Sequence, residues 1–203
     1  MQPIKYIATA TIKSSTTVLT AAKALLLKTD KGRWERVSRE VPPWDDRNSA
    51  IANFIPDGVS VLDLGCGAQT MRRHLKSGCK YQPCDIIQSS ADVIYCDFNA
   101  GIYPALSTTY DYVICSGIFE YMRDPAGFLC EIRTYGRKFV FTFNPSNSKQ
   151  LLVERLGKGW VNHLQESDVE QLFSANKLAF RVLRRKDITT VCQEVIFELS
   201  PIQ

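Results

Sequence analysis

The stretch Val61-Leu-Asp-Leu-Gly-Cys-Gly67 decides the fold. It is a short apolar run that ends in two glycines separated by one residue. Glycine has no Cβ, so a strand with this ending brings bare backbone close to a ligand. In an open α/β sheet, ligands bind beyond the carboxyl ends of the strands, where the strand order reverses. The stretch therefore predicts a parallel strand followed by a ligand-binding loop.

The residues around the two glycines restrict the kind of ligand. A dinucleotide-binding loop follows the pattern G-x-G-x-x-G, and the third glycine would fall at position 70, which is Thr70. The phosphate-binding pattern G-x-x-x-x-G-K-[ST] is absent from the sequence. Asp63 stands two residues before the first glycine, and a carboxylate there would repel a pyrophosphate. We therefore expect a cationic or zwitterionic ligand.

Strand and helix patterns alternate on both sides of this stretch. Asp124-Pro125 is a typical helix start, because Asp is a good N-cap and Pro suits the first helical position. The sequence predicts a Rossmann-like, doubly wound α/β sheet that is mostly parallel and carries an antiparallel terminal hairpin. The expected strands are 59–64, 80–84, 92–96, 111–116, 138–143, 178–185 and 191–199, and the expected helices are 18–27, 49–55, 69–76, 124–135 and 167–176.

The quoted stretch resembles motif I of the class I S-adenosylmethionine-dependent methyltransferases, and the likeness extends over residues 57–199. In that family, the acid of motif I contacts the methionine end of the cofactor and the glycines let the cofactor lie over the strand end. The resemblance gives these roles to Asp63, Gly65 and Gly67. The family often has a further glycine two residues on, where this chain has Gln69, so the shape of the loop is open.

Two further positions agree with the resemblance. Asp85 ends the second strand, where an acid of the family accepts hydrogen bonds from both ribose hydroxyls. Asp97 and Phe98 follow the third strand, where the family holds the adenine with a carboxylate and a packed side chain. The same likeness places Ser116 among the cofactor-binding residues. S-adenosylmethionine is therefore the expected cofactor, and S-adenosylhomocysteine the expected product.

The segment 111–132 resembles the fourth-strand region of the family, in which Tyr121 replaces the usual histidine. Methyl transfer is an in-line displacement, and a hydroxyl acceptor would normally need a base. His163, in the loop after the fifth strand, and Tyr121 are the candidate catalytic residues. Each has an alternative role, because His163 could fix its loop and Tyr121 could pack. Glu120 also points toward the acceptor side.

The acceptor is expected to be a small molecule or a carbohydrate-type compound. The Asn/Asp-Pro-Pro-Tyr/Phe motif of enzymes that methylate nucleic-acid amino groups is absent after the fourth strand, and no RNA-binding module is visible. Nucleic acid is disfavoured without being excluded. An RNA or protein methyltransferase remains an alternative, as does a catalytically inactive cofactor-binding partner protein.

The positive charge of the chain lies in its first residues. Residues 1–40 hold eight basic and three acidic residues, whereas the formal net charge of the whole chain is +4. A Pro42-Pro43 break follows. We expect a basic N-terminal segment or lid at 1–47 and an S-adenosylmethionine-binding domain at 48–203. The local positive field favours an anionic acceptor, although a solvated basic arm is an equally good interpretation.

Cysteine usage and hydropathy indicate a cytoplasmic protein. Seven cysteines are present and no pair has C-x-x-C spacing, so neither a disulfide scaffold nor a metal site is expected. The N-terminus lacks the apolar core of a signal peptide. No apolar run reaches the roughly 18 residues of a membrane span.

Overall fold

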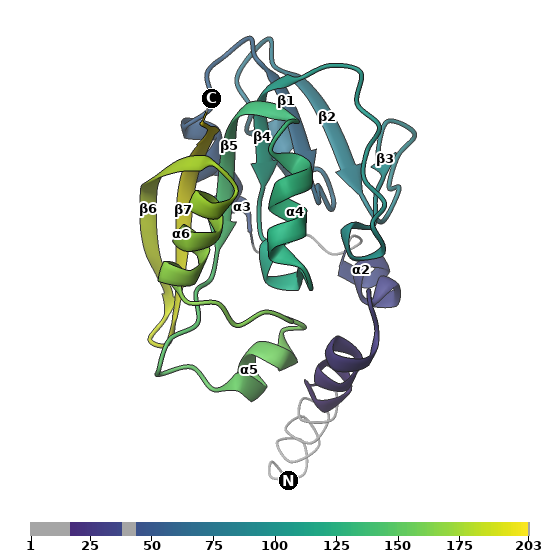
Figure 1. Ribbon diagram of the computed structural model, residues 1–203. Coiled ribbons are helices and arrows are strands. Elements are labelled where there is room, and N and C mark those ends of the chain that lie inside the picture. Colours follow the sequence, from purple (N-terminus) through teal and green to yellow (C-terminus); the bar gives the residue numbers. More distant parts are fainter. Residues whose placement is uncertain (1–16, 38–43, 203) are drawn as a thin grey trace, which may run out of the picture.

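The computed structural model describes residues 17–37 and 44–202. They form a seven-stranded sheet of order β3-β2-β1-β4-β5-β7-β6 (Figure 1). The basic residues Lys5, Lys13 and Arg39 and the Pro42-Pro43 break lie outside the described residues. The strands are β1 (Ser60–Leu64), β2 (Lys80–Asp85), β3 (Ile94–Tyr95), β4 (Tyr110–Cys115), β5 (Gly136–Phe143), β6 (Leu178–Thr189) and β7 (Cys192–Pro201).

The pairing of the strands confirms the predicted topology. β1 lies at the centre and pairs in parallel with β2 on one side and β4 on the other. β5 continues the parallel part, and β7 joins it antiparallel before the hairpin turns back into β6. The order reverses between β1 and β4, so the binding position expected for such a sheet is the carboxyl end of these two strands.

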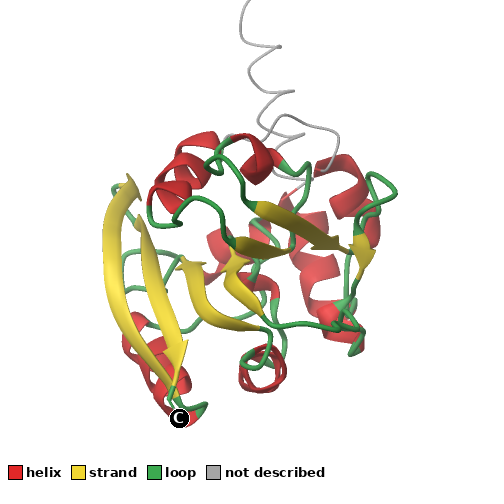
Figure 2. Cartoon of the chain, turned by 90° about the horizontal axis from the view of Figure 1, so that it is seen from above, coloured by secondary structure: helices red, strands yellow, loops and turns green. Residues whose placement is uncertain are grey.

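Helices cover both faces of the sheet (Figures 1 and 2). α4 (Pro125–Ile132) and α6 (Glu166–Ala175) pack on one face, and α3 (Asp45–Asn53) packs on the other. The strands serve both cores because successive side chains point to opposite faces. Leu62 joins the α4 side, for example, whereas its neighbour Val61 joins the α3 side. This explains why the central strands are nearly continuous apolar runs.

Several predicted elements differ from the structure. The helix predicted at 69–76 is only a 3-10 turn, η1 (Thr70–Arg73). Residues 65–79 join β1 to β2, and left-handed residues lie on both sides of η1, at Gln69 before it and at Gly78 after it. The helix predicted at 49–55 begins earlier, at Asp45, and therefore crosses the predicted domain boundary at residue 48. The third strand is shorter than predicted, and the short helix α5 (Leu152–Gly157) was not expected. The predicted N-cap of α4 is confirmed, since Asp124 accepts a hydrogen bond from Gly127 N.

The described N-terminal part lies beside the carboxyl ends of the strands. Residues 17–26 are helical, and α2 (Lys31–Val37) follows them (Figure 1). Arg123 fixes the end of the first helix by donating hydrogen bonds to the carbonyls of Ala24, Leu27 and Lys28. The N-terminal part is thus tied to the loop that follows η3 (Phe119–Tyr121). No helix in the described part of the chain is long and apolar enough to cross a membrane.

Candidate functional site

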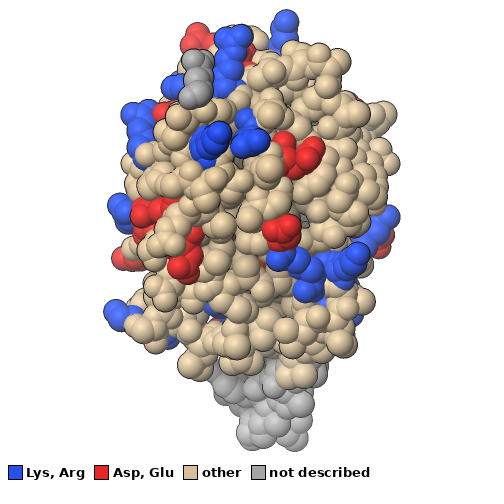
Figure 3. All heavy atoms as spheres, in the orientation of Figure 1, with Lys and Arg blue, Asp and Glu red and all other residues tan. Residues whose placement is uncertain are grey.

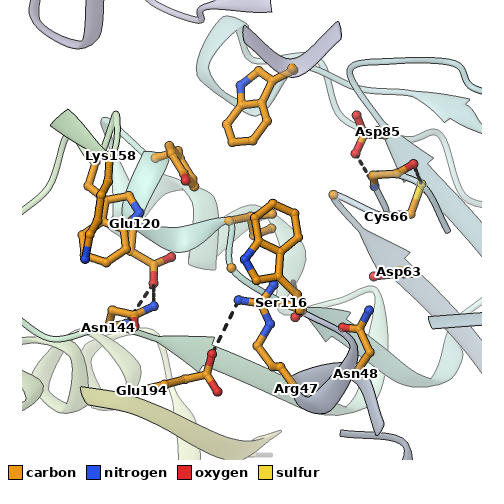
Figure 4. A pocket seen from close by; sticks show the side chains of 18 of the residues that line it. Arg47, Asn48, Asp63, Cys66, Asp85, Ser116, Glu120, Asn144, Lys158 and Glu194 are labelled. Atoms are coloured by element: carbon orange, nitrogen blue, oxygen red, sulfur yellow. Dashed lines mark hydrogen bonds and ion pairs between the residues drawn. The ribbon is translucent and has the colours of Figure 1, made fainter. Parts of the chain in front are cut away.

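A cavity of about 620 Å³ opens at the carboxyl ends of the parallel strands. The loops after β1, β2, β3 and β4 form its floor, and α2, α3 and the β6–β7 hairpin contribute to its walls (Figure 4). His163 is not one of its lining residues. The sequence-predicted residues that do line it are Asp63, Gly65, Gly67, Asp85, Asp97, Phe98, Ser116 and Tyr121.

Both glycines of the binding loop are in the left-handed region that favours glycine. Gly65 has φ +76°, and a Cβ at this position would lie 2.2 Å from Cγ2 of Ile118. Gly67 has φ +52°, and no described atom lies within 4 Å of the place where its Cβ would stand. Gly65 is therefore required for packing, and Gly67 leaves bare backbone facing open space.

Gln69 stands where class I methyltransferases often have a glycine, yet the backbone at this position is left-handed. Gln69 has φ +55°. Its Nε2 donates a hydrogen bond to Oγ of Ser90 over 2.6 Å, and its Oε1 accepts one from Arg72 over 2.8 Å. The side chain thus ties the binding loop to the loop after β2, which a glycine could not do.

Asp85 is a buried acid that shapes the same loop. Its Oδ2 accepts a hydrogen bond from Gly67 N over 2.8 Å, and its Oδ1 accepts one from Ile87 N over 2.9 Å. Burial raises the pKa of the Asp85 carboxyl, and the backbone N–H groups of Ile87, Gly67 and Ile86 oppose this rise. Each carboxylate oxygen has a second lone pair, so Asp85 could also accept from two ligand hydroxyls.

Asp63 is almost fully buried at the end of β1. The hydroxyl of Tyr81 donates to its Oδ2 over 2.6 Å. Burial raises the pKa of Asp63 to about 7, and the charge of Asp85 adds to this, whereas Tyr81 and the charge of Arg47 act against it. A cationic group in the cavity would favour the ionised form. Sequence reasoning missed Tyr81, because nothing in the order of residues shows that it reaches Asp63.

Asp97 and Phe98 lie at the side of the cavity nearest the N-terminal part. Asp97 caps the 3-10 helix η2 (Phe98–Ala100), and its Oδ1 also accepts a hydrogen bond from Oγ1 of Thr29 over 2.8 Å. The Phe98 ring packs 5.1 Å from the ring centre of Phe128. An N-terminal residue therefore touches one of the predicted cofactor acids, a contact that the sequence did not indicate.

Glu120 brings an unusual carboxyl group to the side of the cavity across from Asp63 and Asp85 (Figure 4). Its side chain is almost fully buried, and its Oε1 accepts hydrogen bonds from the backbone N of Asn144 over 2.8 Å and from its Nδ2 over 2.6 Å (Figure 4). Its Oε2 is buried and has no hydrogen-bond partner among the described residues, and the same holds for Oγ of Ser116. Both residues line the cavity.

His163 belongs to a hydrogen-bond network centred on the buried Arg155. Arg155 Nε donates to Nδ1 of His163 over 3.3 Å, and Arg155 Nη1 donates to the carbonyl of Asn144 over 3.0 Å. Burial lowers the pKa of His163, and the charge of Arg155 lowers it further. The guanidinium also lies over the Trp160 ring, 4.7 Å from its centre. Of this group, Asn144 and Trp160 line the cavity.

Tyr121 faces the cavity among aromatic and basic side chains. Its ring meets that of Trp34 edge-on, with 4.7 Å between the ring centres, and Arg33 lies over its face at 5.6 Å. Burial raises the pKa of the Tyr121 phenol, and the charge of Arg33 opposes this. The phenol therefore stays protonated at neutral pH and is available as a hydrogen-bond donor.

Several basic side chains line the cavity. Arg47 and Arg184 both pair with Glu194, over 3.5 and 3.3 Å. Arg33 and Lys158 line the cavity too, but within residues 17–37 and 44–202 no carboxylate is within ion-pair distance of either. Elsewhere acidic and basic side chains are interspersed, as on the face shown in Figure 3. The cavity lining as a whole holds more acidic than basic side chains, so Arg33 and Lys158 are local positive groups within it.

A family model described as methionine biosynthesis protein MetW matches residues 45–199. The chain belongs to the MetW family. The match begins at the first residue of α3 and ends within β7, so it covers the sheet and the loops that form the floor of the cavity. No curated protein matched the chain in a sequence search.

Solved structures place this MetW-family chain in the class I methyltransferase fold. A candidate O-methyltransferase of Nostoc punctiforme is 14% identical, with a TM-score of 0.66 and coverage of 94% of this chain and 68% of that one. Magnesium protoporphyrin IX methyltransferase of Synechocystis, solved with S-adenosylhomocysteine, is 15% identical, with a TM-score of 0.59 and coverage of 84% and 94%. A Burkholderia thailandensis didemethyltoxoflavin methyltransferase with its acceptor and S-adenosylhomocysteine is 16% identical, with a TM-score of 0.54 and coverage of 100% and 92%.

Proposed function

We propose that this MetW-family chain transfers a methyl group from S-adenosylmethionine to a small-molecule or carbohydrate-type acceptor. The observation that carries the proposal is the convergence of Asp63, Asp85 and Asp97 on one cavity. These three acids lie in order at the carboxyl ends of β1 and β2 and just after β3, as the resemblance requires. Solved relatives of the same fold that hold S-adenosylhomocysteine support the choice of cofactor.

The residues of the cavity fit this cofactor. The open space above Gly67 would accept the methionine part, and a cationic amino group there would meet the buried carboxyl of Asp63. Asp85 would receive the ribose hydroxyls on its two remaining lone pairs. Asp97 and Phe98 would hold the adenine, and Ser116, directly after β4, lines the cavity with a buried hydroxyl that has no partner among the described residues. When bound, the cofactor supplies a methyl group on a sulfonium, and the protein aligns the acceptor and excludes water.

The basic residues support an acceptor that carries a negative charge. Arg33 and Lys158 bring cationic groups to the cavity, and neither has a carboxylate within ion-pair distance in the described part of the chain. A phosphate or carboxylate on the acceptor would be an anionic partner for them. Tyr121 and Trp160 offer aromatic walls on the same side. Tyr121 is thus our first candidate for an acceptor-contacting residue. His163 is better suited to fixing its loop, because Arg155 occupies its Nδ1, and because burial and then the charge of Arg155 lower its pKa.

The N-terminal segment is proposed to act as a lid. Thr29 contacts Asp97, where the adenine is proposed to bind, and Trp34 contacts Tyr121, where the acceptor is proposed to bind. Arg33 of the same segment lines the cavity. A lid that covers both positions would exclude water from the reaction.

Calorimetry with S-adenosylmethionine and S-adenosylhomocysteine tests cofactor binding. We expect binding of both, and no detectable heat at millimolar ligand would refute the proposal. A screen for S-adenosylhomocysteine formation over phenols, hydroxy acids, sugars and their phosphates then tests transfer. Binding without turnover on any acceptor would favour an inactive cofactor-binding partner protein.

A further inference from the structure

The carboxyl group of Glu120 has one oxygen without a partner, although the side chain is only 1% exposed. Buried polar atoms in folded proteins almost always form hydrogen bonds, and a buried carboxylate oxygen is costly when it forms none. Oε2 of Glu120 therefore needs an explanation. Because Glu120 lines the cavity, a molecule in the cavity could provide the missing donor.

The protein holds this oxygen in place rather than letting it turn away. Oε1 is fixed by both donors of Asn144, and Asn144 is in turn held through its carbonyl by Arg155. The backbone carbonyl of Glu120 also accepts hydrogen bonds from the N–H groups of Val161 and Asn162, over 2.9 and 3.3 Å. Backbone and side chain are both anchored, so rotation of Glu120 would break bonds that are already formed.

The surroundings of Glu120 define what could donate to it. Tyr121 and Trp160 place aromatic rings on the acceptor side of the cavity, which suits a planar molecule. Their faces are already approached by cations, since Arg33 lies over Tyr121 and Lys158 lies 4.5 Å from the ring centre of Trp160. A bare ammonium ligand would meet these charges, whereas an anion would be attracted by them.

This inference rests on the proposed function. We propose that Glu120 binds the molecule that is methylated, and that the nucleophilic O–H or N–H of this molecule donates a hydrogen bond to Oε2 of Glu120. The acceptor is a planar small molecule that also carries a carboxylate or phosphate, which pairs with Arg33 and Lys158. In the transfer, a lone pair of the acceptor's oxygen or nitrogen forms the bond to the methyl carbon as the carbon–sulfur bond breaks. The electrons of that bond stay on sulfur, and the acceptor's proton passes to Oε2 of Glu120.

The variant Glu120→Gln reverses the hydrogen-bonding character of this one atom. The amide oxygen can still accept from Asn144, while the NH₂ group replaces Oε2 and donates into the cavity instead of accepting. The matched control is Glu131→Gln, because Glu131 is exposed on α4 and does not line the cavity. Circular dichroism and thermal melting establish that both variants are folded.

The experiment measures binding of three probes to protein saturated with S-adenosylhomocysteine. The probes are meta-hydroxybenzoate, which has both groups, benzoate, which lacks the hydroxyl, and phenol, which lacks the carboxylate. We expect meta-hydroxybenzoate to bind best, and Glu120→Gln to weaken it about tenfold or more while leaving benzoate nearly unchanged. Glu131→Gln should change neither affinity.

Two results would overturn the inference. One is that meta-hydroxybenzoate binds no better than benzoate, or does not bind at millimolar concentration, in which case a water molecule satisfies Oε2. The other is equal loss of all probes in Glu120→Gln, which indicates a general packing role. The preceding titration with S-adenosylhomocysteine separates these results from a failure of the proposed function, since that failure would abolish cofactor binding in the wild-type protein.

Discussion

Replacing Asp85 by alanine should weaken the cofactor strongly. In the proposed complex, its two oxygens accept one hydrogen bond each from the ribose hydroxyls, and a hydrogen bond to a charged group contributes about 1.5–3 kcal/mol. Water that enters the space left by the carboxylate would form hydrogen bonds with the ribose hydroxyls and so recover part of this binding free energy. The expected loss is about 2–4 kcal/mol, or roughly 30-fold to 1000-fold in the dissociation constant.

The same substitution should also loosen the binding loop. Gly67 N and Ile87 N both donate to Asp85, so Asp85→Ala leaves two backbone donors without their acceptor. We expect a loss of stability of about 1–3 kcal/mol, which urea unfolding measures independently.

Isothermal calorimetry with S-adenosylhomocysteine is the deciding assay for Asp85→Ala. The control is Asp57→Ala, which removes an exposed acid outside the cavity and should change neither affinity nor stability. An affinity change below about threefold in a folded Asp85→Ala variant, which corresponds to well under 1 kcal/mol, would show that the ribose is held elsewhere.

Three further predictions concern other parts of the site. Gln69→Gly should be more stable to urea than Gln69→Ala by about 1 kcal/mol, because both lose the side-chain bonds but only glycine relieves the left-handed backbone. Since the pKa of Asp63 is raised to about 7 from an ordinary value of 3.8, the free energy of unfolding should fall as pH rises between these values, and Asp63→Asn should flatten this dependence. Arg123→Ala should speed tryptic cleavage after Lys28 several-fold, because it frees the carbonyls that hold the N-terminal helix.

Each of these has an outcome that contradicts it. Equal stability of the two Gln69 variants would mean that the turn is not strained. A stability that rises with pH over the stated interval, or an unchanged profile in Asp63→Asn, would show that Asp63 is ionised throughout. Cleavage of Arg123→Ala at the wild-type rate, with the exposed Arg137→Ala as control, would show that other contacts hold the segment.

The sequence indicated the sheet well because its signals are local. Continuous apolar runs such as the one in β4 indicate a strand that is buried on both faces, and the Asp124-Pro125 pair indicates a helix start. The helix predicted at 69–76 was wrong, because the left-handed Gln69 and the left-handed Gly78 limit the helical stretch between them to η1. The helix preference of a segment does not show where the turns on either side of it will fall.

The strand-end residues of the cavity lining were predictable for the same reason, whereas the hydrogen-bond network across the loops was not. Asp63 and Asp85 lie at strand ends that a pattern can find. The network of Arg155, Asn144 and Glu120 joins residues from separate segments, and only the packing of the loop after β5 brings them together. Likewise, the sequence contains no sign that Thr29 meets Asp97.

The position of β7 has a consequence for how the chain assembles on the ribosome. β6 emerges before β7, yet its place in the sheet lies beyond β7, so β6 has no strand to pair with until the later segment arrives. Until then, β5 presents an open edge beside the buried Phe139, Phe141 and Phe143. Open apolar edges recruit other strands and promote aggregation. Nascent chains stalled within the β6–β7 hairpin should therefore be the species that most need a chaperone.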